Sequence, residues 1–382
     1  MARIVLDATA LDRVNPGSGQ YRYVMDLVRG LWRLAADDEF VLCGSRPAPV
    51  AELEAVFADG GRWAYRQQTP TSGRGGAYVD QLRWSVLLRR ERADLVHALH
   101  TFVPLLTRVP VVVTVYDLMF ELFPEYAEAV RSRPYRQYRW AVRHRARRVI
   151  AISRTTAADL KRLWGVGGDL VDVVALGSDP TADELPTPAG LSSLAAERNL
   201  VVSPYNLEPR KNLVALLRAA AAVRRDVPDL GIALYGAAAL TPEREAAFAA
   251  DVAALQLEGA VVRTGLLDAR ALTWLYRRAA VFVFPSLYEG FGLPVLEAMG
   301  AGACVIARGE SAMAEVLGDA GILVETRDAD ALAAALRAML RDPGRRRELG
   351  ERARARAREF SVRRMAEETH RAYHRSLAGE AG

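Results

Sequence analysis

The chain has 382 residues, of which 51% are hydrophobic and 25% charged, and its formal net charge is +5. This length exceeds the usual size of one hydrophobic core, so we expect two domains. No apolar run reaches the ~18 residues of a membrane span, and a strand directly follows Met1 where a signal peptide would stand, so we expect a cytoplasmic protein. Cys43 and Cys304 lie far apart in the sequence, which predicts two reduced thiols and no disulfide framework.

Short apolar segments alternate with longer helical stretches along the chain. The first series of expected strands lies at 4–6, 40–43, 95–98, 111–115, 149–152 and 171–176. The second series lies at 200–203, 230–235, 260–264, 281–284, 304–307 and 321–324. This alternation predicts an α/β protein with two parallel sheets, each covered by helices.

A Pro- and acid-rich segment, 177–188, separates the two series of strands and marks the domain boundary. We therefore predict an N-terminal domain at 1–180, a C-terminal domain at 190–360 and a terminal helix at 361–382 that crosses back to the first domain. The charged segment 345–376 has a helical pattern. In open parallel sheets, ligands bind beyond the carboxyl ends of the strands, so a cleft between the domains is the default site.

The segment 285–300 combines two acids with a Gly-rich entry into a helix. Glu289 and Glu297 stand eight positions apart, with Gly290 and Gly292 between them. Glycines let a ligand approach the backbone, and the N–H groups at a helix start favour a diphosphate. Either acid alone is equally well explained as a solvated loop acid or as a carboxylate that satisfies the helix N-terminus.

The segment 208–212, Glu-Pro-Arg-Lys-Asn, places two cations at a strand-to-helix turn. Departure of a nucleoside diphosphate leaves negative charge on oxygen. Arg210 and Lys211 would stabilise this charge in a site that contains little water. The alternative is a polar helix start in which an ion pair involves Glu208.

These two segments resemble motifs of the retaining glycosyltransferases of family 4, whose fold is called GT-B. The resemblance implies two Rossmann-like parallel-sheet domains that face each other across a cleft, with an acceptor-binding N-terminal domain and a nucleotide-sugar-binding C-terminal domain. It also implies that Glu297 holds the ribose hydroxyls of the donor and that Glu289 contacts the transferred sugar. Arg210 and Lys211 correspond to the residues that hold the diphosphate.

Further donor contacts follow from the same resemblance. They fall on Gly17, Gly19, Tyr116, Asp117, Gly265, Leu266, Phe291, Gly292 and Leu293. Many family members carry His where Tyr116 stands, and that His reaches the 6-hydroxyl of the donor sugar. A phenol can also donate a hydrogen bond, or the site could fit a 6-deoxy sugar. A second departure is Tyr205-Asn206, which stands where the family commonly has Gly-Thr, and it puts a backbone phosphate contact in doubt.

Two histidines at the end of the strand 95–98, His97 and His100, are assigned to the acceptor pocket by the resemblance. A structural histidine is the alternative for His97. A metal pair is disfavoured, because a spacing of three does not put both side chains on one face of a strand. The N-terminal loop 17–22 lacks the third Gly of a nicotinamide-dependent dehydrogenase, and an ordinary turn is its plain alternative.

Basic residues crowd the segment 131–148. They are Arg131, Arg133, Arg136, Arg139, Arg143, Arg145, Arg147 and Arg148. This cluster could bind anionic lipid headgroups or an acidic acceptor, and a solvated helix face is the alternative. We expect no nucleic-acid partner, because no aromatic platform or reading helix accompanies the charge.

The resemblance implies a retaining, metal-independent hexosyltransferase. Its donor would be a nucleoside-diphosphate sugar, with a GDP-mannose-like donor favoured, and its acceptor a saccharide, a lipid-linked molecule or a natural product. Asp328-Ala329-Asp330 matches a metal motif of another glycosyltransferase class, but helix capping explains it better. We expect no cofactor, and a location in the cytoplasm, with peripheral contact at the inner membrane face as an extension. The alternative function is a catalytically inactive sugar-nucleotide-binding protein.

Overall fold

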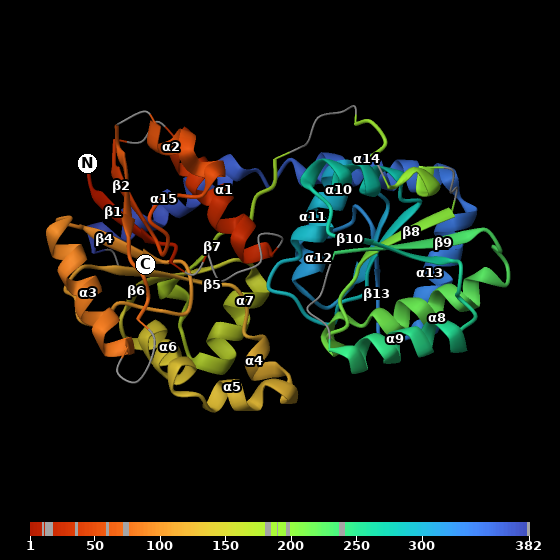
Figure 1. Ribbon diagram of the computed structural model, residues 1–382, viewed down its shortest axis with the longest axis horizontal. Coiled ribbons are helices and arrows are strands. Elements are labelled where there is room, and N and C mark those ends of the chain that lie inside the picture. The colour runs from red at the N-terminus through yellow and green to blue at the C-terminus, as the bar shows by residue number, and fades with distance from the viewer. Residues whose placement is uncertain are drawn as a thin grey trace. The chain divides into compact units, whose positions relative to one another are not determined.

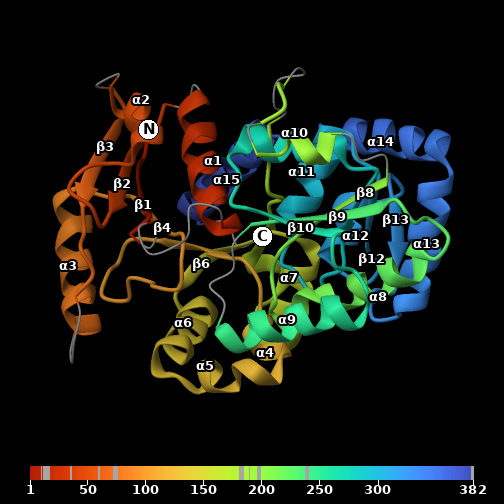
Figure 2. The same ribbon diagram turned by 45° about the vertical axis from the view of Figure 1, so that its right-hand side comes forward.

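The computed structural model describes residues 1–9, 11, 18–34, 37–58, 61–71, 76–179, 185–188, 190–195, 199–236 and 241–379. These residues form two compact units (Figure 1, Figure 2). Unit 1 comprises Met1–Gly177 with Val362–Gly382, and unit 2 comprises Ser178–Ser361. The sequence places the corresponding limits at 180, 190 and 361. That the N-terminal domain binds the acceptor and the C-terminal domain binds the nucleotide sugar stays a prediction.

The described part of unit 1 contains a seven-stranded sheet in the order β3-β2-β1-β4-β5-β6-β7. The strands are β1 (Arg3–Asp7), β2 (Glu39–Gly44), β3 (Trp63–Gln67), β4 (Leu95–Ala98), β5 (Val111–Val115), β6 (Ala146–Ala151) and β7 (Val171–Val173). All neighbouring strands are parallel, as predicted. The strand β3 has no counterpart among the expected strands, because Arg66 and Gln67 leave it without a continuous apolar run.

Helices of unit 1 follow the strands. They are α1 (Gly19–Arg33), α2 (Glu54–Ala58), α3 (Gly76–Arg90), α4 (Met119–Leu122), α5 (Ala127–Arg131), α6 (Arg133–His144), α7 (Arg154–Asp159) and α15 (Val362–Ala378). The Ser153 side chain accepts a hydrogen bond from the Thr156 N–H and so caps the start of α7. Helix α15 packs along α1 (Figure 2), and a Cβ at Gly30 would lie 2.7 Å from the Ala366 Cβ. Only glycine allows this close approach.

The described part of unit 2 contains a six-stranded parallel sheet in the order β10-β9-β8-β11-β12-β13. The strands are β8 (Asn199–Pro204), β9 (Leu230–Tyr235), β10 (Val261–Gly265), β11 (Val281–Phe284), β12 (Val305–Arg308) and β13 (Ile322–Val324). The helices are α8 (Leu213–Arg224), α9 (Pro242–Ala254), α10 (Ala269–Arg278), α11 (Leu293–Ala301), α12 (Ala312–Leu317), α13 (Ala329–Arg341) and α14 (Pro343–Ala357). Each expected strand of this half is present within one residue of its predicted bounds. The Asp328 carboxylate accepts from the N–H groups of Asp330 and Ala331, which confirms its capping role.

Shorter helical turns connect these elements. They are Ala51–Leu53, Pro124–Tyr126, Leu160–Trp164, Gly168–Leu170, Ser192–Ala195 and Pro209–Lys211. The charged segment 345–376 forms two helices, α14 and α15, because i to i+3 hydrogen bonds tighten the chain at 358–360 and end α14. Cys43 and Cys304 are buried free thiols, as predicted. Among the described residues, no helix has both the length and the apolar character needed to cross a membrane.

Candidate active site

Two loops of unit 2 meet at the carboxyl ends of the neighbouring strands β8 and β11. The Leu287 N–H donates to the Arg210 carbonyl at 2.7 Å, and the Ser286 Oγ lies 3.3 Å from the same carbonyl oxygen. Parallel strands end at the same edge of a sheet, so segments that are 70 to 80 residues apart in the chain become neighbours. The two motifs of the sequence therefore form one site.

Asn212 fixes the chain where the turn Pro209–Lys211 passes into α8. Its φ of 55° is in the left-handed region, which Asn tolerates better than most residues. Its side-chain amide donates to the Thr326 carbonyl at 2.7 Å and to the Pro285 carbonyl at 3.4 Å. The amide thus ties together the ends of three strands and fixes the direction of the preceding side chains.

Arg210 and Lys211 converge on the carboxylate of Glu289. Lys211 Nζ lies 2.5 Å from Glu289 Oε1, and Arg210 Nη1 lies 3.4 Å from Oε2. The Ser286 hydroxyl donates to Oε1 at 2.7 Å. Arg210 Nε also pairs with Glu208 Oε2 at 2.8 Å, so the ion pair that the sequence left open as an alternative is present beside the contact with Glu289.

The cluster is partly shielded from solvent and stays ionised. The side chains of Arg210, Lys211 and Glu289 are 11%, 19% and 15% exposed. Burial alone would raise the pKa of Glu289, but the charges of Lys211 and Arg210 and their hydrogen bonds hold it below its ordinary value. An anion that enters here meets two oriented cations in surroundings that screen charge less than water does.

Glu297 lies on α11 at the end of a hydrogen-bonded tyrosine pair. The Tyr276 hydroxyl donates to Glu297 Oε2 at 3.2 Å and lies 2.7 Å from the Tyr235 hydroxyl. Tyr276 is 1% exposed, and a buried phenol needs such a partner. The sequence analysis missed both tyrosines. Their signal was a phenol at the end of β9 and another on the apolar side of α10.

Helix α11 begins where the sequence predicts, after a glycine whose backbone conformation would strain any other residue. Gly292 has a φ of 105°, and a Cβ there would lie 2.9 Å from Met313 Cγ. Pro294 occupies the first turn. Phe291 and Leu293 are 4% and 8% exposed, so these two predicted donor residues can offer a ligand mainly their backbone.

The remaining predicted donor residues of unit 2 lie at the end of β10. Gly265 has a φ of 72° and accepts a hydrogen bond from the Gly236 N–H, while the Leu266 side chain is 65% exposed. Tyr205, one of the departures from the family pattern, is 6% exposed, and its hydroxyl donates to Glu245 at 3.0 Å. Asn206 Oδ1 accepts from the Glu208 N–H at 2.8 Å, so this segment is held by its own side chains.

In unit 1, His100 lies beside a buried acid at the carboxyl ends of β1 and β4. Its Nε2 is 3.0 Å from Asp7 Oδ1 and 3.0 Å from Thr9 Oγ1. The Phe102 N–H donates to His100 Nδ1 at 3.1 Å, so a neutral His100 carries its proton on Nε2. Asp7 is fully buried and also accepts from the Thr9 hydroxyl at 2.7 Å. The sequence analysis missed Asp7 and Thr9, whose only signal was an acid at the end of the first strand.

A cavity of about 360 Å³ adjoins this group. Its lining includes Thr9, Asp80, Trp84 and His100. It therefore presents an imidazole, a hydroxyl and a carboxylate beside an aromatic ring, which is a lining suited to a hydroxylated ligand.

His97 has a structural role, which corrects its predicted place in the acceptor pocket. Its side chain is fully buried, and its Nδ1 and Nε2 atoms lie 2.7 Å from the Tyr373 hydroxyl and 2.8 Å from the Thr114 hydroxyl. Burial lowers the pKa of His97 to about 3, so the ring is neutral. The imidazole links β4 to α15 and β5 and has no exposed face for a ligand.

The other predicted donor residues of unit 1 are engaged with their own unit. The Tyr116 hydroxyl donates to the Leu99 carbonyl at 2.7 Å, and Asp117 Oδ1 accepts from the Met119 N–H at 3.0 Å. Gly19 begins α1 after the cap residue Ser18. Gly17 lies outside the described residues.

The Arg-rich segment divides into structural and exposed side chains. Arg139, Arg145 and Arg148 are bound to Glu121, to the Thr107 carbonyl and to Asp172. The exposed members are Arg131, Arg133, Arg136, Arg143 and Arg147. At 100° per residue, Arg136 and Arg143 share a strip of α6 with Trp140, which is 49% exposed.

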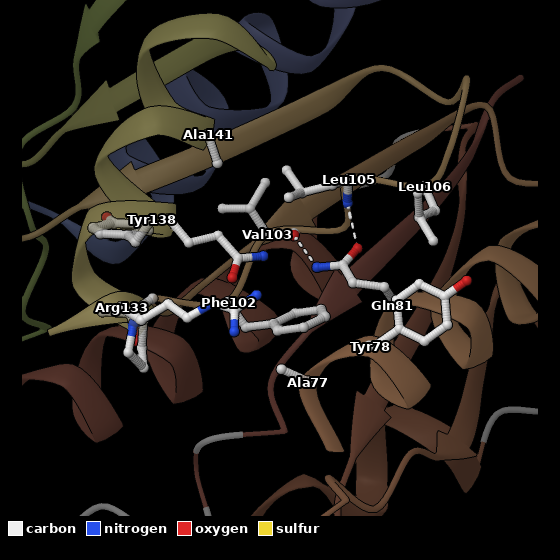
Figure 3. A pocket seen from close by; sticks show the side chains of 13 residues that line it. Ala77, Tyr78, Gln81, Phe102, Val103, Leu105, Leu106, Arg133, Tyr138 and Ala141 are labelled. Atoms are coloured by element: carbon white, nitrogen blue, oxygen red, sulfur yellow. Dashed lines mark hydrogen bonds between the residues drawn. The ribbon is translucent and has the colours of Figure 1, made fainter. Parts of the chain in front are cut away.

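A second cavity of unit 1, of about 470 Å³, lies beside a different face of α6, which includes Arg133, Tyr138 and Ala141 (Figure 3). Its apolar lining comes from α3, the segment 101–106 and α6. Gln81 at its wall donates to the Val103 carbonyl at 2.9 Å and accepts from the Leu105 N–H at 2.6 Å. Tyr78 and Leu106, which also line it, are 64% and 45% exposed.

Comparisons with known proteins agree with this architecture. Residues 17–182 match the family Glycosyltransferase Family 4, and residues 192–356 match Glycosyl transferases group 1. The chain is 32% identical to alpha-maltose-1-phosphate synthase of Mycolicibacterium smegmatis, over 75% of this chain and 80% of that protein. The chain belongs to glycosyltransferase family 4. This family 4 enzyme is also 29% identical to O-antigen chain mannosyltransferase B of Escherichia coli, over 69% of each chain.

Solved structures show that this glycosyltransferase has the GT-B fold. Sucrose-phosphate synthase from Thermosynechococcus elongatus superposes with a TM-score of 0.78 at 23% identity, over 100% of both chains. Anabaena HepE in complex with UDP and glucose superposes with a TM-score of 0.75 at 19% identity, over 98% of this chain and 100% of that one. The prediction of a GT-B protein with two parallel-sheet domains is confirmed.

Proposed function

We propose that this family 4 glycosyltransferase moves a hexose from a nucleoside-diphosphate sugar to a hydroxyl of its acceptor, with retention at the anomeric carbon. The observation that carries the proposal is the cluster of Arg210, Lys211 and Glu289 in unit 2. Two partly buried cations are held in place by one ionised carboxylate. Such a cluster is suited to bind a departing diphosphate. Anabaena HepE, which has a similar fold, has been crystallised with UDP and glucose.

Lys211 and Arg210 bind the leaving group in this proposal. As the bond between the anomeric carbon and the phosphate oxygen breaks, negative charge grows on that oxygen. Cations fixed in advance stabilise this charge without having to reorganise. An ammonium has three N–H groups and a guanidinium five, so each cation can keep its contact with Glu289 and still bind a phosphate oxygen.

Glu289 has two tasks in this mechanism. It orients both cations, and a carboxylate has about four lone-pair sites, which leaves capacity to accept hydrogen bonds from sugar hydroxyls. Glu297, oriented by the Tyr276 hydroxyl at 3.2 Å, is assigned to the ribose hydroxyls of the donor. The backbone at the start of α11 adds N–H groups for a phosphate.

The reaction needs no protein nucleophile. The acceptor oxygen forms its bond to the anomeric carbon on the face that the diphosphate leaves, and the acceptor proton passes to a diphosphate oxygen. Arg210 and Lys211 supply the positive charge for which other glycosyltransferases use a divalent metal, so we propose a metal-independent reaction. The cavity beside His100 is our candidate for part of the acceptor site.

A GDP-mannose-like donor is the favoured candidate. Its support is the similarity to a mannosyltransferase of Escherichia coli, whereas the crystallised complex of HepE contains UDP. Thermal-shift screening against UDP, GDP, ADP and TDP, followed by the matching sugars, selects the donor. Replacing Tyr116 by His and repeating the comparison of mannose with 6-deoxy donors tests the proposed link between this residue and the 6-position.

The decisive experiment uses the only two lysines of the chain as a matched pair. Lys211→Ala is expected to lower turnover at saturating donor by about 10²-fold to 10³-fold, because this is the usual effect of removing one group that stabilises the transition state. Lys161→Ala, at an exposed position of unit 1, is expected to keep wild-type turnover. Full turnover of Lys211→Ala would overturn the assignment, and an inverted product anomer by NMR would overturn retention. Donor binding without transfer or hydrolysis would favour the inactive binding protein.

We also infer that unit 1 contacts an anionic membrane surface through the exposed part of the Arg-rich segment. The support is the strip of Arg136, Trp140 and Arg143, because aromatic and basic side chains together favour a headgroup region. Sedimentation with vesicles tests this. Phosphatidylglycerol vesicles should retain the enzyme and neutral phosphatidylcholine vesicles should not. If phosphatidylglycerol vesicles retained the double variant Arg136→Glu, Arg143→Glu as well as the wild type, the contact would be refuted.

A further inference from the structure

Two of the five histidines of the chain stand four positions apart on α15. Residues with this spacing are neighbours on one face of a helix. The ring centroids of His370 and His374 are 4.6 Å apart, and their Nε2 atoms are 3.3 Å apart. The Nε2 atoms of the two rings therefore point toward the same place beside the helix.

Asp38, directly before β2, brings a carboxylate to that point. Its Oδ2 lies 2.8 Å from His370 Nε2 and 2.9 Å from His374 Nε2. Its Oδ1 accepts from the Ala2 N–H at 2.7 Å, which fixes the orientation of the carboxylate. Contacts of this kind hold the ligands around protein-bound metals. The Asp38 side chain is 3% exposed, whereas His374 is 51% exposed and gives solvent access to the site.

The separations among these three atoms are those of ligands around one metal ion. A divalent transition metal binds nitrogen and oxygen at about 2.0–2.1 Å, which sets two ligands about 2.9 Å apart at a right angle and about 3.3 Å apart at the tetrahedral angle. The observed separations of 2.8, 2.9 and 3.3 Å lie close to this range. A metal could therefore be bound with shifts of a few side-chain atoms.

We propose that Asp38, His370 and His374 bind one divalent transition-metal ion, with Zn²⁺ as the ion that suits two imidazoles and one carboxylate. Water completes the coordination on the exposed side. The competing arrangement is a metal-free trio in which both imidazoles donate to Oδ2.

The metal would act as a clamp within unit 1. It joins the start of β2 to α15, two segments that are 332 residues apart in the chain at Asp38 and His370. A ligand that binds only the folded chain stabilises it. The site stands before β2, at the amino ends of the strands of unit 1, whereas Asp7 and His100 stand at their carboxyl ends, so we assign this metal a structural role. The inference stands independently of the proposed transfer reaction.

Metal binding by the full chain, free of any affinity tag and stripped with a chelator, tests the proposal. Titration with Zn²⁺ in calorimetry should give one equivalent per chain, and Co²⁺ should give visible absorption bands of a bound ion. With Zn²⁺ about a hundredfold above its Kd, we expect Tm to rise by about 5 °C. Glycosyl transfer at 25 °C should survive chelation.

Three variants test whether Zn²⁺ binds at this site and not elsewhere on the chain. His374→Ala, at a half-exposed position, and Asp38→Asn should each weaken Zn²⁺ binding by at least about tenfold and abolish the rise in Tm. His144→Ala, which removes an exposed histidine of α6, should bind as the wild type does. The metal-free trio would be established by absence of stoichiometric Zn²⁺ binding. Unchanged affinity in His374→Ala would likewise overturn the proposal.

Discussion

The two clusters at the carboxyl ends of the sheets differ in the chemistry that they offer. In unit 2, Arg210 and Lys211 surround an ionised Glu289, and all three side chains are partly exposed. In unit 1, Asp7 is fully buried and holds the Thr9 hydroxyl and the His100 imidazole by hydrogen bonds. The first group is built from opposed charges and suits a phosphorylated ligand. The second is built from directed hydrogen bonds and suits hydroxyl groups.

This difference also explains why one cluster was easier to find. The charges of unit 2 stand within two short motifs, each of which contains several unusual residues. The group in unit 1 takes one or two residues from each of two strand ends, and neither segment is unusual by itself. Four substitutions test this comparison. They are Glu289→Gln, His97→Gln, His100→Gln and Tyr276→Phe.

The largest effect is expected from Glu289→Gln. The change removes the negative charge that orients Lys211 and Arg210, so turnover should fall by about 10²-fold or more. Affinity for the nucleoside diphosphate should stay equal or rise, because two cations lose their counter-charge. Glu208→Gln is the matched control, since that side chain is 34% exposed, and it should change turnover by no more than about fivefold. Equal losses in both variants, measured by single-turnover kinetics, would contradict the central role of Glu289.

The stability of unit 1 should depend on acid through the buried His97. The folded pKa of His97 is lowered to about 3, so between pH 6.5 and pH 3 the unfolded chain binds the proton that the folded chain does not. Stability should therefore decrease as pH falls through this window, by about 1.4 kcal/mol per pH unit from this group. His97→Gln removes this contribution, which urea midpoints at several pH values will show. An unchanged pH slope in the variant would refute the structural role.

The substitution His100→Gln, at the other histidine of this strand end, should weaken binding of the acceptor. Loss of the imidazole at the cavity wall is expected to raise the KM for the acceptor by about tenfold, the cost of about one hydrogen bond. The KM for the donor should be that of the wild type. An effect confined to the donor would show that this cavity is not part of the acceptor site.

The smallest effect is expected from Tyr276→Phe. The phenol donates to Glu297 at 3.2 Å and is itself in contact with Tyr235, so its loss leaves Glu297 less well oriented. We expect the KM for the donor to rise by about fivefold with little change in kcat, because the residue acts through Glu297. A lower kcat at unchanged KM would argue for a different role.

The sequence by itself determined the fold class and located the two motifs of the candidate site. Alternation of buried apolar strands with amphipathic helices has few physical solutions, so two parallel sheets could be expected, and strands such as Leu230–Tyr235 and Val281–Phe284 have the predicted bounds. The strand Trp63–Gln67 escaped, because the polar Arg66 and Gln67 leave it without a continuous apolar run. The segments 208–212 and 285–300 were evident because charge and glycine there are not explained by packing.

Only the tertiary structure decided which side chains meet. His97 and His100 look alike in the sequence, yet one is enclosed between β5 and α15 and the other lies at a cavity. Asp38 gains its two histidines from a helix more than 300 residues later in the chain. The physical reason is that hydrogen bonds and ion pairs depend on separations of a few ångströms in space. Local periodicity fixes the direction of a side chain on its own element, whereas its partner is set by how distant elements pack.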